Sequence, residues 1–184
     1  MDPDGRKTMK VTDEQWGQIS QAKENVSKNL ENLITYLKTS NNDIDKVDSK
    51  IIKSAQTYLS SEFGSAPFDC DELASRLESI KFEIDNLGRD DFLYNDSYED
   101  KYATTMPIGS KKIVLGDLFF SSRMNGSFDS KEGTLLHEAT HHLSVFGTFD
   151  LSYKDETMVK LPDWGIFSKS NNANNWEYFY EEIY

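Results

Sequence analysis

The chain holds three histidines, and all of them lie in one short stretch: His137, His141 and His142. An α-helix turns by about 100° per residue, so His137 and His141 project side by side from one helix face. Two imidazoles in that arrangement supply two nitrogen ligands to a zinc ion. Glu138 projects about 100° away from His137 around the helix, but it can reach a water bound to the ion and accept a proton from that water. The His-Glu-Ala-Thr-His pattern therefore predicts metal-assisted hydrolysis, with His142 packed nearby as a supporting residue.

A catalytic zinc site has three protein ligands and one open position, and no further histidine remains to complete it. Two kinds of carboxylate are candidates for the third ligand. One is a glutamate on a later helix, Glu177 or Glu181. The other is Asp150, which lies close to its own helix if Gly147 turns the chain back in a left-handed conformation. The spacing alone leaves both alternatives open.

The helices that must support this site begin in the first half of the chain. Apolar residues recur there every three or four positions, which is typical of amphipathic helices. Thr12 with Gln15, and Asp69 with Glu72, form the starts of two of them. We predict helices over residues 12–38, 44–63 and 69–87.

The second half of the chain carries the histidine helix itself. We predict it over residues 129–147, with Asp129 and Glu132 as its capping box, Gly147 at its end, and an apolar side that includes Leu143. Residues 90–110 read as a loop, Lys111–Gly116 as a β-strand and 171–183 as a final short helix. We expect a single domain over residues 1–184, in which 1–90 form a helical part and 91–184 carry the metal site and substrate pocket.

Composition excludes several classes of function. The formal net charge of −12 repels phosphate backbones, which argues against nucleic-acid binding. The single cysteine, Cys70, allows no internal disulfide. We find no apolar run long enough for a membrane span and no signal peptide. We expect a monomer that is secreted or delivered by a signal-less route, as a bacterial toxin or effector would be, rather than a cytoplasmic protein.

Residues after the second histidine resemble a known family. Gly147, Thr148, Asp150 and Tyr153 follow the histidine motif in the order Gly-Thr-x-Asp-x-x-Tyr. This pattern is similar to that of the aspzincin metallopeptidases, the family of deuterolysin and the peptidyl-Lys metalloendopeptidases. The resemblance implies a zincin-like α+β domain, mainly helical with a small sheet, that holds one zinc ion. It also implies Asp150 as the third ligand and Tyr153 as the phenol that hydrogen-bonds the oxyanion.

A second motif supports the same resemblance. The segment NANNWEYF, residues 172–179, is similar to one near the C-terminus of the peptidyl-Lys enzymes. In those enzymes an aspartate and a glutamate form an acidic pocket for the lysine that follows the cut bond. The resemblance implies Asn174 and Glu177 as substrate-binding residues. Because Asn174 stands where the family has aspartate, one of the two charges is missing here.

These observations together predict a zinc-dependent endopeptidase with Glu138 as general base. Its substrates would be proteins or peptides, with lysine favoured after the scissile bond. We also expect the strand Lys111–Gly116 to be an edge that pairs with the extended substrate. The alternatives are a metal-dependent amidase acting on non-protein amides, a metal-binding module without catalysis, and an acidic helical interaction protein without metal.

Overall fold

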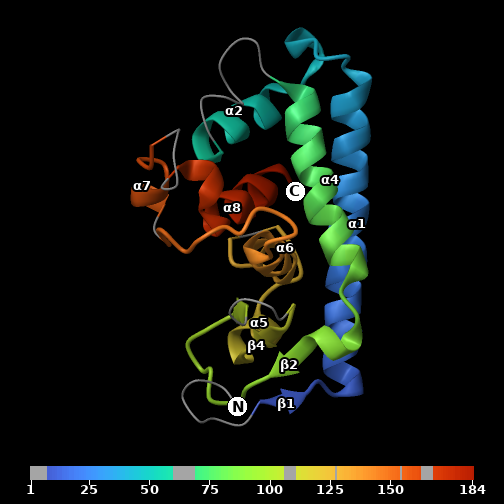
Figure 1. The fold of residues 1–184 in the computed structure, drawn as a ribbon, viewed down its shortest axis with the longest axis vertical. Coiled ribbons are helices and arrows are strands. Elements are labelled where there is room, and N and C mark those ends of the chain that lie inside the picture. The colour runs from blue at the N-terminus through green and yellow to red at the C-terminus, as the bar shows by residue number, and fades with distance from the viewer. Residues whose placement is uncertain (1–7, 60–68, 106–110, 127, 154, 163–167) are drawn as a thin grey trace.

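The protein is described from a computed structural model, which covers residues 8–59, 69–105, 111–126, 128–153, 155–162 and 168–184. Two long helices, α1 (Asp13–Thr39) and α4 (Cys70–Asn86), lie side by side along one side of the molecule (Figure 1). Three shorter helices pack together beside them: α2 (Ser49–Tyr58), α6 (Lys131–His141) and α8 (Ala173–Ile183). A small sheet lies below α6, at the end of the molecule that holds β1 (Met9–Lys10). The predicted α+β fold, mainly helical, is confirmed.

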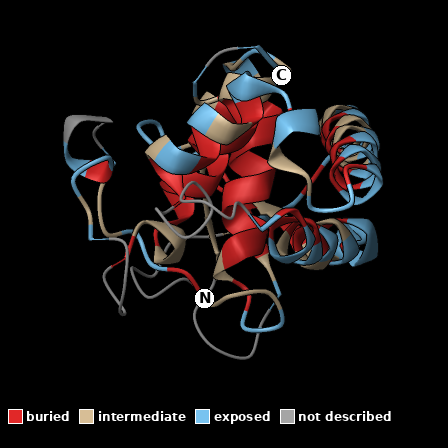
Figure 2. Cartoon of the chain, turned by 90° about the horizontal axis from the view of Figure 1, so that it is seen from above, coloured by how far each residue is buried: buried red, intermediate tan, exposed pale blue. Residues whose placement is uncertain are grey.

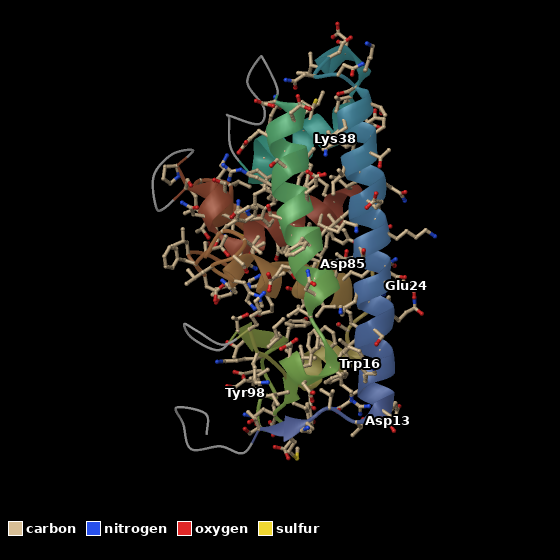
Figure 3. The ribbon with its side chains drawn as sticks, turned by 45° about the vertical axis from the view of Figure 1, so that its right-hand side comes forward. Asp13, Trp16, Glu24, Lys38, Asp85 and Tyr98 are labelled. Carbon is tan, nitrogen blue, oxygen red and sulfur yellow. The ribbon has the colours of Figure 1, made fainter. Side chains whose placement is uncertain are left out.

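The long helices begin as predicted. The Thr12 side chain accepts a hydrogen bond from the backbone of Gln15, whose side chain accepts one from the backbone of Thr12. The Asp69 side chain caps α4 by accepting a hydrogen bond from the backbone N–H of Glu72, without the reciprocal bond seen at Thr12. Charged side chains such as Glu24 lie on the outer side of this helical pair (Figure 3). No described helix is long and apolar enough to cross a membrane.

The second predicted helix is shorter than expected. A 3₁₀ turn, η1 (Ile44–Lys46), precedes it, and Asp48 then caps α2 by accepting a hydrogen bond from the backbone of Lys50. The expected end of this helix, residues 60–63, lies outside the described residues. Further short elements are η2 (Arg89–Asp91), α5 (Asp117–Ser121), α7 (Asp155–Met158) and η3 (Lys169–Asn171).

The sheet corrects two predictions. It contains β1, β2 (Phe92–Tyr94), β3 (Ala103–Thr105) and β4 (Ile113–Leu115), in the order β1-β2-β4-β3. The segment 90–110, predicted as a loop, therefore supplies two strands. β4 lies between β2 (parallel) and β3 (antiparallel) with all three of its residues buried, so the prediction that it is a substrate-pairing edge is wrong. Among the described strands, β3 forms the edge on the side of α6.

The histidine helix lies at the centre of the molecule and differs from its predicted bounds. All residues from Lys131 to Thr140 are buried, and Figure 2 shows the buried residues gathered in this central region. Its N-cap is Ser130 rather than Asp129, because the Ser130 hydroxyl accepts the Gly133 backbone N–H at 2.9 Å. A Cβ on Gly133 would lie 2.2 Å from a carboxylate oxygen of Glu181 on α8, so a larger residue here would require the Glu181 side chain to shift.

The same helix also ends earlier than predicted, at His141 instead of Gly147. His142 leaves the helix and its Nδ1 lies 2.9 Å from Glu83 Oε1 of α4. The Ser144 hydroxyl donates to the other oxygen of Glu83 at 2.7 Å. The chain therefore turns toward α4, and Leu143, expected on the buried side, is 77% exposed.

Candidate metal centre

Three ligand atoms converge on one point beside α6. The Nε2 atoms of His137 and His141 lie 3.1 Å apart, and Asp150 Oδ1 lies 3.1 and 3.2 Å from them. Ligand atoms of a tetrahedral zinc site, each about 2.0–2.1 Å from the ion, lie about 3.3 Å from one another. The three atoms therefore form one face of a tetrahedron of the size that zinc requires.

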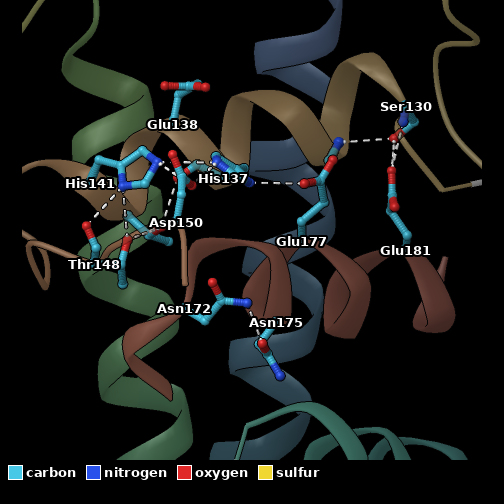
Figure 4. A network of polar contacts seen from close by, with 12 residues as sticks. Ser130, His137, Glu138, His141, Thr148, Asp150, Asn172, Asn175, Glu177 and Glu181 are labelled. Carbon is cyan, nitrogen blue, oxygen red and sulfur yellow. Dashed lines mark hydrogen bonds and ion pairs between the residues drawn. The ribbon is translucent and has the colours of Figure 1, made fainter. Parts of the chain in front are cut away.

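The outer nitrogen of each histidine is held by an oxygen that can only accept a hydrogen bond. His137 Nδ1 lies 3.0 Å from Glu177 Oε2, and His141 Nδ1 lies 2.9 Å from the carbonyl oxygen of Thr148 (Figure 4). Each Nδ1 must carry the proton, which leaves the Nε2 lone pair free for a metal. Such oxygen partners also fix the ring orientation of metal-binding histidines.

The turn after the helix brings Asp150 to the histidines. Gly147 has a φ of +62°, a left-handed conformation that favours glycine, and its N–H donates to the His142 carbonyl at 3.1 Å. The next residue, Thr148, donates its N–H to the Thr140 carbonyl, also at 3.1 Å. The predicted return of the chain at Gly147 is therefore correct, although the helix itself ends earlier.

Asn172 holds the other side of the Asp150 loop. Its Oδ1 accepts hydrogen bonds from the backbone of Leu151 and Ser152, at 2.9 and 3.2 Å. Phe149 forms a parallel bridge with Asn172, so the loop is attached to the start of α8 on both sides of Asp150. This positioning role of Asn172 was not predicted from the sequence, although Asn172 is the first residue of the NANNWEYF segment.

Glu138 lies next to the convergence point and is oriented by the sheet. One ligand atom each of His137, Glu138 and His141 lies within 4.8 Å of the others. The Thr105 hydroxyl, at the end of β3, donates to Glu138 Oε2 at 2.6 Å. Thr105 was also missed from sequence, because its segment carries no recognisable pattern.

The electrostatics of this cluster suit a cation. Burial lowers the pKa of His137, but Asp150, Glu177 and Glu138 outweigh burial and raise it well above the ordinary value. Burial likewise opposes, and Asp150 and Glu138 favour, the raised pKa of His141. The pKa of Asp150 is lowered because the two histidines outweigh its burial. The surroundings thus stabilise positive charge at the point where the three ligand atoms meet, as a divalent ion requires.

The remaining predicted residues lie around one cavity of about 520 Å³ beside His137. Asn174, Glu177 and Tyr153 line it together with Glu138 and Asp150. Burial and a hydrogen bond to Asp150 raise the pKa of Tyr153, so its phenol stays protonated and lies near the metal point.

Two other candidates lie away from the convergence point. Glu181 binds Ser130, with Oε1 accepting from the backbone N–H at 2.7 Å and from the hydroxyl at 2.6 Å. Burial, with a contribution from Glu177, raises the pKa of Glu181 to about 8. His142 is buried against Glu83, in line with its predicted packing role.

Comparisons with known proteins agree with this geometry. Residues 21–181 match the family model of the aspzincins, described as lysine-specific metallo-endopeptidase. The chain is 34% identical over 82 residues to a peptidyl-Lys metalloendopeptidase of Armillaria mellea, and 35% identical over 80 residues to an extracellular protease of Aeromonas hydrophila. These matches cover 45% and 44% of the chain, but only 23% of the length of each relative.

The fold is also that of a solved structure. A zinc peptidase from Grifola frondosa superimposes with a TM-score of 0.65 at 20% identity, over 94% of this chain and 98% of that one. The resemblance inferred from the two motifs is confirmed, and zinc is confirmed as the cofactor that the family implies. The chain belongs to the aspzincin family of metallopeptidases.

Proposed function

We propose that this protein is a zinc-dependent endopeptidase. The observation that carries the proposal is the triangle formed by His137 Nε2, His141 Nε2 and Asp150 Oδ1, with Glu138 beside it. When bound there, zinc would polarise the scissile carbonyl and make a water more acidic. The relatives named above as a metalloendopeptidase and an extracellular protease support this reading, and the second supports a place of action outside the cytoplasm.

Residues of the chain transfer the proton, stabilise the developing negative charge and orient the zinc ligands. Glu138 accepts the proton of the attacking water and passes it to the leaving amine, while Thr105 fixes the direction of its carboxylate. Tyr153 donates a hydrogen bond to the carbonyl oxygen as negative charge develops on it. Glu177 and Thr148 hold the two histidine rings in place.

The substrate would lie along β3. This strand is the described sheet edge next to α6, and Ala103 and Thr104 line the cavity together with the neighbouring Tyr102. An extended peptide added to this edge would present a carbonyl to the metal point. Its following side chain would enter the cavity where Asn174 and Glu177 lie, and the charge of Glu177 favours lysine there.

Helices and sheet both pack against α6, which supports our proposal of one catalytic domain over residues 1–184. We propose that it acts as a monomer on proteins or peptides. A metal-dependent amidase for non-protein amides is the alternative that keeps the same metal site.

The test compares wild type, Glu138→Gln and the charge-matched control Asp71→Asn, an exposed residue in the first turn of α4. Each zinc-loaded protein is incubated with a lysine-rich unfolded protein, and zinc content is measured in parallel. We expect cleavage by wild type and control, and none by Glu138→Gln at unchanged zinc content. Zinc-loaded wild type that hydrolyses small amides but no peptide would favour the amidase, and a fully active Glu138→Gln would contradict the mechanism.

A further inference from the structure

The cavity beside His137 carries more negative charge than the family motif alone explains. Besides Glu138 and Glu177, its lining includes Asp100 and Asp129, which come from two other segments of the chain. The one described lysine of the lining, Lys101, has its Nζ 5.3 Å from the ring centre of Tyr98. The cavity is therefore acidic even though Asn174 has replaced an acidic residue.

A polar atom without a partner indicates that this cavity takes a hydrogen-bond donor. Asn174 lines the cavity and is 4% exposed, yet its Oδ1 accepts no hydrogen bond from any described residue. Leaving a buried acceptor unpaired costs free energy that a ligand donor would recover. Glu177 uses Oε2 to hold His137, and within the described chain no donor binds its other oxygen.

Asp129 is built into the wall of the same cavity. It has a φ of +60°, and both of its neighbours are attached to α8, the helix that carries Asn174 and Glu177. The Phe128 ring stacks on Tyr178 with centres 4.4 Å apart. Ser130 is held by its two hydrogen bonds to Glu181. These contacts fix Asp129 relative to the pocket rather than leaving it on a free loop.

The negative charges of Asp129 and Glu177 both contribute to the raised pKa values of the same two groups. Burial, followed by Asp129 and Glu177, raises the pKa of Tyr102, which lines the cavity. Burial, Glu177 and, to a smaller extent, Asp129 raise the pKa of Glu181. Both carboxylates therefore act on the same region.

Building on the proposed peptidase function, we infer that Asp129 is a further specificity-determining residue. It supplies the second negative charge of the pocket, which Asn174 no longer provides, and with Glu177 and the Asn174 oxygen it selects an ammonium group on a long side chain. Lysine after the scissile bond is the substrate feature that meets all three groups.

The test measures binding as well as cleavage. Zinc-loaded wild type, Asp129→Asn and the control Asp71→Asn are titrated by calorimetry with the tripeptide Lys-Ala-Ala and with its norleucine analogue, which has the same stem without the charge. Asparagine tolerates a left-handed φ as aspartate does, so Asp129→Asn keeps the local backbone. We expect wild type and control to prefer the lysine peptide, and Asp129→Asn to lose about tenfold of that preference. Asn174→Asp should increase the preference by a similar factor.

Cleavage of matched peptides with lysine or norleucine after the scissile bond gives the second readout, and kcat/KM ratios should follow the binding ratios. An unchanged lysine preference in Asp129→Asn, or no preference in wild type, would overturn the inference while leaving peptidase activity intact. Absence of cleavage by wild type, with the binding preference present and reduced in Asp129→Asn, would instead contradict the proposed function and retain the pocket.

Discussion

Replacing Glu83 by glutamine should destabilise the protein, and the loss should depend on pH. Glu83 lies on α4, is 1% exposed and joins three partners: Lys111 at 2.7 Å, Ser144 at 2.7 Å and His142 at 2.9 Å. Burial alone would raise the pKa of Glu83, but these three hydrogen bonds lower it to about 2 from an ordinary 4.5. A carboxylate with its pKa lowered to that extent contributes roughly 3 kcal/mol to the free energy of unfolding at neutral pH.

The direction of the pH dependence of stability follows from the lowered pKa of Glu83. The contribution is complete above pH 4.5, where Glu83 is ionised in both folded and unfolded chains, and disappears as pH falls toward 2. Urea unfolding of wild type and Glu83→Gln, at several pH values between 2.5 and 7, measures the difference. We expect roughly 3 kcal/mol at pH 7 and a steady decrease below pH 4.5. A difference that stays constant over this range would refute the assignment of the stabilisation to an ionised Glu83.

Three substitutions test the groups that orient the site. Glu177→Gln keeps an acceptor for His137 Nδ1 but removes the charge, so zinc affinity, measured by chelator competition, should fall by about 10- to 100-fold; unchanged affinity would contradict the role of Glu177. Thr105→Val removes the hydrogen bond to Glu138 and should lower kcat by about tenfold without changing zinc content, whereas normal kcat would show that Glu138 needs no orientation. Tyr153→Phe should lower kcat/KM on a peptide by roughly 100-fold, and a value close to wild type would remove Tyr153 from the mechanism.

The parts of the fold that sequence predicted well are those whose signal is local. The capping box of Thr12 and Gln15 and the cap at Asp69 depend on residues three positions apart, and both are present. The small sheet depends on pairing between distant segments. β2 and β3 have three residues each, too few to show a period of two. The strand β4 was predicted, but as an edge of the sheet, whereas it lies between β2 and β3.

The bounds of the histidine helix, α6, likewise depend on contacts with distant segments. Its pattern predicted a helix up to Gly147, but the side chains of His142 and Ser144 bind Glu83 of α4 and turn the chain away after His141. Asp129 reads as a helix cap from its spacing to Glu132, whereas packing against α8 makes Ser130 the cap. In both places a contact with a distant helix decided the outcome.

The site was predictable where it follows a motif and not where it follows packing. His137, Glu138, His141 and Asp150 stand in the motif, and the structure brings them together. Thr105 lies in a segment without a motif, and Asn172 lies in the NANNWEYF segment, where nothing in the pattern indicates that its side chain holds the Asp150 loop. Their roles become visible only when β3 and α8 are placed beside α6.

Zinc content of wild type and of Asp150→Ala, measured by mass spectrometry after zinc loading and extensive dialysis, tests the central claim most directly. Asp96→Asn, an exposed loop residue outside the cavity lining, serves as the control. We predict one zinc ion per chain in wild type and control, and little or none in Asp150→Ala. One tightly bound zinc ion per chain in Asp150→Ala would contradict the ligand set of His137, His141 and Asp150 and point to a glutamate of α8 as the third ligand.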